Sequence, residues 1–516
     1  MMDFELLVDR LDATNSTNAK VKALETFFKT ASAPTAVWAL ALLSGNRPKR
    51  LVSTTLLKEW GCEKQAMPAW LMDECYAFVG DLAETLALLT PNPEIEIHPS
   101  LSTLMGEYLQ HLKSEYLPEK KAWIFSQWET MGPTQRWIFN KILTGGFRLG
   151  VSQKLVIKAI ARVHSLPEET VTHRLLGKWN PSESFWHELI APTMEMPPSH
   201  PYPFFLANTW EGKLPVQDFL VEWKWDGIRC MAIKRNNQVF LWSRGEEIIT
   251  HQFPEIEKSL MNLPDGTVID GELLPVQNGE VADFSILQIR LGRKKVSSKM
   301  MEENPVIFRA YDLLECNGTD LRTLPLLERK QKLEQIGLSD VSPFWNVSNE
   351  AELEQFRSRS LEHRAEGLML KHQHSEYGVG RTKGSWWKFK VDPRSIDAVL
   401  LYAQAGHGRR ANLFTDYTLA VWDGDRLLPF AKAYSGLTKE EIEDVDRFIK
   451  ANTLERFGPV RTVKPELVFE IGFEGIGESK RHKSGVAVRF PRILRWRKDK
   501  PAKEANTIDD LRALIR

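Results

Sequence analysis

The chain has 516 residues and no formal net charge, since 68 lysines and arginines balance 68 aspartates and glutamates. This length exceeds what one hydrophobic core usually holds, and it predicts two to four domains. With 42% hydrophobic and 26% charged residues and no long apolar run, the sequence is that of a soluble globular protein; it excludes a membrane span and a chain coated in positive charge.

The first two hundred residues predict helix after helix. Apolar residues recur at three- and four-residue spacing in Phe4–Leu11, Val21–Phe28, Trp123–Phe139 and Leu155–Val163. The proline-rich stretch Pro192–Pro203 cannot continue a helix and is the best linker in the chain. We therefore predict an all-α domain over residues 1–198.

After this linker the sequence changes to short β-prone runs. These runs are Phe219–Val221, Cys230–Ile233, Val239–Trp242, Thr267–Leu273, Val306–Leu314, Gly367–Lys371 and Trp386–Val391. Helical stretches lie between some of them, at Leu326–Ile336 and Glu350–Glu362. Because hairpin turns are indicated at Asn236–Asn237, Asn278–Gly279 and Asn317–Gly318, we predict an α+β domain over residues 199–393 with a mostly antiparallel sheet.

A third region begins near Ser395. It contains predicted strands at Ala398–Ala403, Tyr417–Trp422 and Leu467–Phe473, with a turn at Asp423–Gly424. Thr438 and Glu441 have the spacing of a capping box at a helix start. Several strands and one helix in about 120 residues predict a small β-barrel of OB type over residues 394–516.

The most informative stretch is EWKWDGIR, residues 222–229. A lysine becomes a nucleophile only when it is deprotonated, which burial or neighbouring positive charge promotes by lowering its pKa. Lys224 lies where an apolar strand gives way to Asp226-Gly227, beside tryptophans that exclude water. Taken alone, the alternative is an ordinary edge-strand lysine before a turn.

Other charged groups end or interrupt the β-prone runs further along the chain. They lie in Ser243-Arg244-Gly245, Asp270-Gly271-Glu272, Tyr311-Asp312, Glu366-Gly367, Trp387-Lys388-Phe389-Lys390 and the basic stretch Arg489–Lys500. Charged residues at such places are costly for folding unless they are paired or bind something. Lys388 and Lys390 alternate on one strand and therefore face the same side.

Together these stretches resemble the ordered motifs of covalent nucleotidyltransferases, specifically the ATP-dependent DNA ligases. The segments EWKWDGIR, SRGEE, DGELL, FRAYDLL, EGLML, WWKFK and RFPRILRWRKDK follow in the family's order between residues 222 and 500. The segment Gln135–Gln153 is also similar to the DNA-binding domain of larger ligases, and a helical domain placed first is typical of bacterial members. The resemblance implies a helical DNA-binding domain, an adenylation domain and an OB-fold domain within the boundaries above.

The resemblance also implies a role for each motif residue. Lys224 is expected to attack the α-phosphate of ATP, and Lys388 and Lys390 to neutralise that phosphate in the transition state. The remaining assignments for the nucleotide, the metal and the DNA are the following. Glu222 accepts from the adenine amino group, Tyr311 stacks on the base, Glu272 binds the ribose, Arg229 and Arg244 contact the nucleotide and the 5′-phosphate of the nick, and Glu366 with Glu272 holds Mg²⁺ (with Mn²⁺ as an alternative ion).

In the last motif, Arg489 and Arg492 or Arg495 and Lys498 are expected to orient the departing pyrophosphate; spacing does not decide between them. Lys141, Arg148 and the Gly145–Gly146 turn are expected to contact DNA phosphates, although a plain inter-helix turn is the alternative. The expected enzyme joins 3′-hydroxyl and 5′-phosphate ends at nicks in double-stranded DNA, in repair, replication or recombination.

Four scattered cysteines without a CxxC pair predict no disulfide framework and no cysteine-rich zinc module, and they fit a reducing cytoplasm. We expect a cytoplasmic monomer that does not associate with membranes. The closest alternatives keep the fold and change the substrate: an RNA ligase or a GTP-using mRNA capping enzyme. A further alternative is a nucleic-acid-binding protein with an inactive ligase core, although Lys224 and Glu366 are retained.

Overall fold

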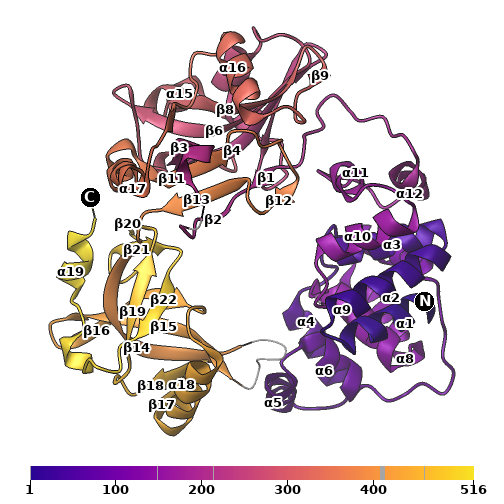
Figure 1. Ribbon diagram of the computed structural model, residues 1–516. Helices are drawn as coiled ribbons and strands as arrows, with labels where there is room; N and C mark the ends of the chain where they lie inside the picture. The colour runs from indigo at the N-terminus through magenta and orange to yellow at the C-terminus, as the bar shows by residue number, and fades with distance from the viewer. Residues whose placement is uncertain are drawn as a thin grey trace. The chain divides into compact units, whose positions relative to one another are not determined.

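The computed structural model describes residues 2–147, 149–212, 214–293, 295–406, 413–457 and 460–515 (Figure 1). By its contacts the chain divides into two compact units, residues 1–156 with 392–516, and residues 157–391. The predicted domain boundaries stay predictions, but the three predicted fold classes are confirmed in chain order: helices, an α+β part and a strand-rich part. None of the helices in the described ranges has the length and apolarity that a bilayer crossing requires.

The N-terminal part is built from helices alone. They are α1 Met2–Asp12, α2 Thr17–Thr30, α3 Ala33–Ser44, α4 Thr54–Lys64, α5 Ala69–Val79, α6 Leu82–Leu89, α7 Leu101–Lys113, α8 Leu117–Thr130, α9 Pro133–Thr144 and α10 Gln153–Val163, followed by α11 Glu168–Arg174 and α12 Glu183–Ile190. The predicted helical stretch Trp123–Phe139 is two helices, because Pro133 has no N–H to continue α8 and instead occupies the first position of α9.

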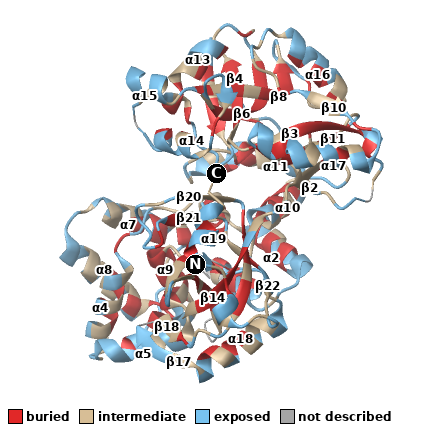
Figure 2. Cartoon of the chain, turned by 90° about the vertical axis from the view of Figure 1, so that its left-hand side faces the viewer, coloured by how far each residue is buried: buried red, intermediate tan, exposed pale blue. Residues whose placement is uncertain are grey.

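Two larger sheets form the α+β part, where the sequence predicted a single sheet. They are antiparallel except where β2 pairs in parallel with β13, and β1 and β12 make a separate short parallel pair. The first has the order β5-β4-β6-β8-β9, with β7 beside β6, and the second has the order β10-β3-β11-β13-β2. Figure 2 shows β4, β6 and β8 as mostly buried. The strands are β1 Phe205–Leu206, β2 Asn208–Thr209, β3 Phe219–Trp225, β4 Ile228–Arg235, β5 Gln238–Ser243, β6 Thr267–Gln277, β7 Glu280–Val281, β8 Val306–Cys316, β9 Thr319–Asp320, β10 Phe344–Asn346, β11 Ala365–His372, β12 Gly380–Arg381 and β13 Trp386–Lys390.

The predicted hairpin turns are present between the strands of the first sheet. Asn236 and Asn237 have φ of 51° and 55° between β4 and β5, as a two-residue hairpin turn of this hand requires. The helices of this part are α13 Pro254–Leu260, α14 Ser285–Arg290, α15 Ser298–Glu303, α16 Leu326–Gln335 and α17 Glu350–Arg359. Of these, α16 packs on β8. Its Arg329 pairs with Asp312 of β8, and its Lys330 pairs with Glu222 of β3.

The C-terminal part is a small barrel with one long helix, as predicted. Its strands are β14 Arg394–Ala405, β15 Phe414–Asp423, β16 Arg426–Ala433, β17 Thr453–Phe457, β18 Val460–Val463, β19 Val468–Phe473, β20 Gly475–Glu478, β21 Val486–Arg489 and β22 Arg492–Trp496, with α18 Lys439–Ala451 and α19 Ile508–Ala513. The order β16-β15-β14-β19-β22 returns on itself, because Ile493 N–H donates to the carbonyl of Ser435 just after β16.

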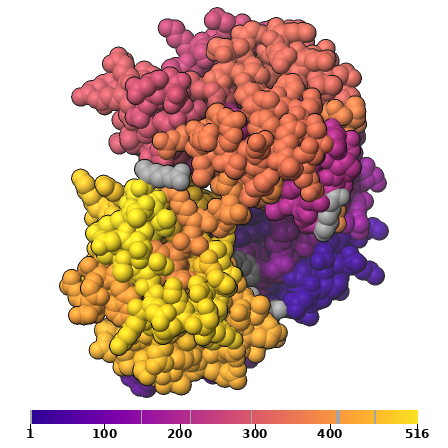
Figure 3. All heavy atoms as spheres, turned by 60° about the vertical axis from the view of Figure 1, so that its left-hand side comes forward, coloured from indigo at the N-terminus to yellow at the C-terminus, as the bar shows by residue number. Residues whose placement is uncertain are grey.

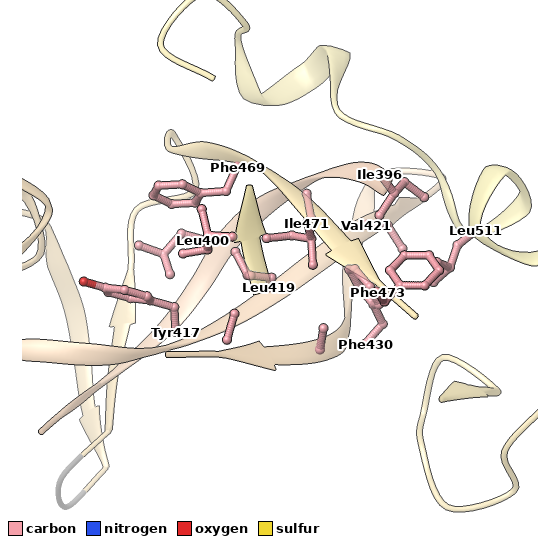
Figure 4. Packing of buried hydrophobic residues seen from close by; sticks show 14 of the residues in the cluster. Ile396, Leu400, Tyr417, Leu419, Val421, Phe430, Phe469, Ile471, Phe473 and Leu511 are labelled. Atoms are coloured by element: carbon pink, nitrogen blue, oxygen red, sulfur yellow. The ribbon is translucent and has the colours of Figure 1, made fainter. Parts of the chain in front are cut away.

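Apolar side chains from opposite walls fill this barrel. Leu400, Leu419 and Ile471 point toward one another, with Tyr417 and Phe473 nearer the two ends (Figure 4). In the space-filling view the C-terminal residues form one continuous body (Figure 3). Thr438 and Glu441 make both hydrogen bonds of the predicted capping box at the start of α18.

Candidate active site

Strand β3 carries Lys224 near its C-terminal end. Because side chains alternate along a strand, Lys224 shares a face with Glu222, whereas Trp223 and Trp225 face the other side. Trp223 stacks on His363 at a centroid distance of 4.5 Å and belongs to a buried apolar cluster. The Lys224 side chain is 23% exposed. The tryptophans therefore anchor a strand that presents one ammonium group on a polar, accessible face.

Glu366 pairs with this ammonium group. Its Oε2 lies 2.5 Å from Nζ of Lys224 and 3.2 Å from Nζ of Lys390. Burial by itself raises the pKa of Glu366, but the two ammonium groups outweigh burial and lower it to about 2. The next residue, Gly367, has φ of 141° where β11 bulges against β3, and a Cβ there would lie 2.3 Å from the carbonyl oxygen of Phe389. Glycine is therefore required for this approach of β11 to β13.

Several cations gather beside this ion pair. Lys388 and Lys390 alternate on β13, so their side chains share one face. Burial lowers the pKa of Lys388, and the charges of Lys390, Arg381, Lys224 and Arg244 lower it further. Like charges repel, and a bound anion relieves this repulsion. This face of the domain is therefore suited to a phosphate group.

Arg229 is held rigidly on β4. Its Nε and Nη2 donate to the two carboxylate oxygens of Asp270 at 3.1 and 2.6 Å. The hydroxyl of Tyr377 donates to the same carboxylate at 2.7 Å. Arg244 lies on the exposed turn after β5, and its backbone N–H donates to the carbonyl of Arg229 at 3.1 Å. Two of the predicted arginines are thus adjacent, one fixed and one free to extend.

Glu272 lies directly opposite Arg229 in the pairing of β4 with β6. Burial raises the pKa of Glu272 to about 8, although the charges of Lys224 and Arg229 act in the other direction. Gly227 leaves room for this side chain, since a Cβ there would lie 2.3 Å from the carbonyl oxygen of Leu273 and 2.7 Å from Cγ of Glu272. A cation bound here would favour the ionised carboxylate.

Glu222 is almost completely buried, with 1% exposure, and is paired with two lysines. Its Oε1 lies 2.7 Å from Nζ of Lys330 in α16, and its Oε2 lies 3.1 Å from Nζ of Lys371 in β11. Burial lowers the pKa of Lys371 to about 8, against the attraction of Glu222. The same ammonium group lies 4.4 Å from the ring centroid of Tyr311. Glu222, Tyr311 and Lys371 therefore form one cluster.

Four residues of this site were not among the predicted site residues: Asp270, Lys330, Lys371 and Tyr377. Lys371 had a recognisable signal, because it is a charged residue at the end of an otherwise apolar predicted strand. Lys330 and Tyr377 had none, since their partners lie more than a hundred positions away in the chain.

The basic residues of the last motif lie in the C-terminal part of the chain. Arg495 pairs with Glu470 at 2.7 Å, and Nζ of Lys498 lies 4.3 Å from the ring centroid of Trp496. Arg489 lies at the end of β21, and Arg492 lies 3.5 Å from Glu474.

In the helical part, Lys141 is largely buried and pairs with Asp81 at 2.6 Å, so its charge is already matched. After α9, Arg47 donates to the carbonyls of Gly145 and Phe147 at 3.1 and 2.8 Å. Arg148 lies outside the described residues.

Family models match three successive parts of the chain. Residues 1–161 match "DNA ligase N terminus", residues 208–390 match "ATP dependent DNA ligase domain", and residues 410–500 match "ATP dependent DNA ligase C terminal region". The middle match contains the cluster around Lys224.

Proteins with similar sequences are also named as DNA ligases. A "Probable DNA ligase" of Koribacter versatilis is 36% identical over 410 residues, which cover 73% of this chain and 71% of the relative. A "DNA ligase" of Methanospirillum hungatei is 31% identical over 387 residues, again covering 73% and 71%. The solved structure "Pmar-Lig_PreS3" superposes with a TM-score of 0.64 at 16% identity, over 96% of this chain and 99% of that one, which shows a shared fold.

Proposed function

The chain belongs to the ATP-dependent DNA ligase family, and on that premise we propose that it seals nicks between 3′-hydroxyl and 5′-phosphate ends in duplex DNA. The observation that carries this proposal is the position of Lys224. Its amine lies on an anchored strand beside Glu366 and among the cations of β13. That arrangement supports an amine nucleophile facing a phosphate.

In the first step Lys224 attacks the α-phosphate of ATP, pyrophosphate leaves, and a lysyl-AMP phosphoramidate forms. Lys224 must first lose its proton, so its pairing with Glu366 has to loosen as the substrate binds. Lys388 and Lys390 neutralise the charge that develops on the phosphate oxygens. Their shared face on β13 supports this role.

The base and the sugar of the nucleotide are held by residues of both sheets. Tyr311 stacks on the adenine, and Glu222 accepts a hydrogen bond from the amino group, which favours ATP over GTP. Glu272 binds the ribose hydroxyls, with Arg229 directly opposite it. Burial of Glu222 supports a role in recognition, because a buried carboxylate distinguishes a donor from an acceptor strongly.

Arg489 with Arg492, or Arg495 with Lys498, orients the leaving pyrophosphate when the C-terminal domain closes on ATP. The domain then turns to clamp DNA in the later steps. AMP passes from Lys224 to the 5′-phosphate of the nick, and the 3′-hydroxyl displaces it.

The carboxylates of Glu366 and Glu272 fit a divalent cation, with Mg²⁺ the expected ion and Mn²⁺ a substitute. Both carboxylates act electrostatically on each other and on Lys224, so they lie in one neighbourhood. Among the described residues no group of three or more acidic, histidine or cysteine side chains is placed to hold a metal. Mg²⁺ needs only one or two protein carboxylates when phosphates supply the other ligands. The ion would polarise the phosphate for attack.

DNA is bound mainly through its phosphates, without reading of sequence. Arg244 and Arg229 contact the 5′-phosphate of the nick. Arg148 and Lys141 are the proposed contacts of the helical domain, where Lys141 would have to exchange its partner Asp81 for a phosphate. The exposed loop 480–483 of the C-terminal domain adds basic residues. The enzyme acts in repair, replication or recombination, as a cytoplasmic monomer.

The test is nick sealing by purified protein freed of bound AMP. A labelled nicked duplex is incubated with ATP and Mg²⁺, and joined strands are separated on a denaturing gel. Lys224→Ala and an ATP-free reaction run beside the wild type. Joining that requires ATP and is lost in Lys224→Ala supports the proposal.

Two other outcomes contradict it in different ways. An ATP-dependent protein–AMP adduct without joining keeps the lysine chemistry and redirects the search to RNA ends. If Lys224→Ala still joins the strands, Lys224 is not the nucleophile.

A further inference from the structure

Helix α16 sends two consecutive cations into the two sheets of the adenylation domain. Arg329 pairs with Asp312 through both carboxylate oxygens, at 2.8 and 2.9 Å, and Asp312 directly follows Tyr311 in β8. Lys330 pairs with Glu222 of β3 at 2.7 Å. Successive helical residues point about 100° apart, so one helix can reach both sheets. The helix thereby connects the proposed stacking residue to the proposed amino-group acceptor.

Neither of these two cations is available to solvent. Arg329 and Lys330 each have 0% exposure, and Lys330 also lies 5.3 Å from the ring centroid of Phe344, the β10 residue opposite Glu222. A buried ammonium group is costly unless an anion accompanies it. Among the described residues, Glu222 is the carboxylate that Lys330 pairs with, which marks Lys330 as a positioning residue for Glu222.

We propose that Lys330 sets the selectivity for adenine by holding the buried carboxylate of Glu222 in one orientation inside the protein. This inference rests on the proposed contact between Glu222 and the base. An ionised carboxylate only accepts hydrogen bonds, so it pairs with the amino group of adenine and repels the carbonyl oxygen of guanine. The ammonium group of Lys330 lies 2.7 Å from one of the carboxylate oxygens and so holds the carboxylate in place.

Both lysines at Glu222 leave it able to bind the base. Lys371 donates to Oε2 of Glu222 at 3.1 Å, whereas Lys330 lies 2.7 Å from Oε1 as an ion pair without hydrogen-bond geometry. A carboxylate has about four acceptor positions, so most of those on Glu222 stay open. Lys371 also touches Tyr311, so it is tied to two functions at once. Lys330 contacts Glu222 without that second connection and is the cleaner residue to test.

The experiment measures formation of the covalent nucleotidyl-enzyme with ATP, GTP and ITP over a range of concentrations. For Lys330→Met we expect KM for ATP to rise and the preference for ATP over GTP to fall about tenfold or more, with little change in the maximum rate. ITP carries the carbonyl of guanine without its amino group, so it should gain as GTP does. Lys330→Arg should restore most of the preference.

Lys332→Met is the matched control, because Lys332 is an exposed lysine of the same helix. If Lys330→Met does not fold, Lys330→Gln keeps a donor and removes only the charge, and the same loss of preference is expected. A Lys330 variant that lowers the maximum rate while its KM and its ATP preference match the wild type overturns the inference. Glu222→Gln distinguishes failure of the role of Lys330 from failure of the proposed contact between Glu222 and the base. If Glu222→Gln also keeps the wild-type preference for ATP, the proposed base contact itself is wrong.

Discussion

Nζ of Lys224 lies 2.5 Å from Oε2 of Glu366, so the proposed nucleophile is held by the carboxylate that is also the proposed metal ligand. One ion pair thus joins two roles. A cation that draws Glu366 toward itself would weaken the hold on Lys224 and leave the amine more free to react. Metal binding and activation of the nucleophile are coupled in this arrangement.

Replacement of Glu366 by glutamine should separate catalysis from stability. We expect lysyl-AMP formation to fall by roughly a hundredfold or more, because a proposed ligand of the cation beside the reacting phosphate is lost. The lowered pKa of Glu366 means that its stabilising effect is present above its ordinary pKa and is lost as the pH falls toward about 2. Glu366→Gln should therefore unfold more readily in urea than the wild type at pH 7, with a smaller difference at pH 3. An equal difference at both pH values contradicts the ion pair.

Glu272→Gln should show the opposite dependence on pH. The folded protein holds the proton of Glu272 up to a pKa of about 8, so its stability is greatest at low pH and is lost as the pH rises through 8, by up to about 1.4 kcal/mol per pH unit. Glutamine removes this loss. We expect the variant to melt at a higher temperature than the wild type at pH 9 and at a similar temperature at pH 5, while ligation is impaired. A variant that is less stable at pH 9 argues against the buried carboxyl.

The sequence predicted the architecture well because its signals are local. Asn236–Asn237 and the capping box at Thr438 specify their turn and helix start through neighbouring residues alone. The split at Pro133 also follows from one residue, because proline has no N–H to continue a helix. The division of the strands into two sheets was not predictable, because it depends on which distant strands pair.

The sequence predicted which residues form the site and their order along the chain, but it did not predict which of them pair with one another. The motif spacing indicated Lys224 and Glu366 as site residues. It does not indicate that Glu366, beside the bulge at Gly367, lies against Lys224. Charged residues were harder still to interpret. Arg290 begins a stretch of the sequence that is rich in basic residues, yet it has 0% exposure and pairs with Glu255. A buried cation requires such an anion, and the sequence does not indicate which one the fold supplies.

Tyr377→Phe tests whether the hydroxyl of Tyr377, through Asp270, fixes the position of Arg229. The phenol donates to Asp270 at 2.7 Å, and without it Asp270 loses one of its donors while the ring stays packed. We expect stability to fall by about 1–3 kcal/mol, because a buried acceptor loses its partner. We also expect a rise in KM for ATP that is larger than the fall in kcat, since Arg229 would be less well ordered. Measurement of both constants, with unfolding by guanidinium, decides this; unchanged KM contradicts the positioning role.

Gly367→Ala should abolish activity through the backbone alone. An added Cβ would lie 2.3 Å from the carbonyl oxygen of Phe389 and 2.5 Å from Cα of Lys390, so β11 must move away from β13. Gly337→Ala is the matched control, because Gly337 also has positive φ, 82°, but has nothing within 4 Å of the added Cβ. The control should cost about 1–2 kcal/mol from backbone strain and keep activity. Equal activities of the two variants would show that the bulge is not needed.

Arg244→Ala tests whether the exposed turn after β5 contacts the phosphate of the nick. The side chain is exposed and its charge acts on Lys388, so it can reach a phosphate beside the reacting group. Loss of one phosphate contact should lower the slope of log affinity against log salt by about one, for nicked duplexes of any sequence. Fluorescence anisotropy with a labelled nicked duplex over a range of salt concentrations measures this slope, and nucleotidyl-enzyme formation without DNA serves as the second readout. If Arg244 contacts DNA rather than ATP, Arg244→Ala should form the nucleotidyl-enzyme at a rate within about twofold of the wild type. An unchanged salt slope with slower nucleotidyl transfer would instead assign Arg244 to ATP.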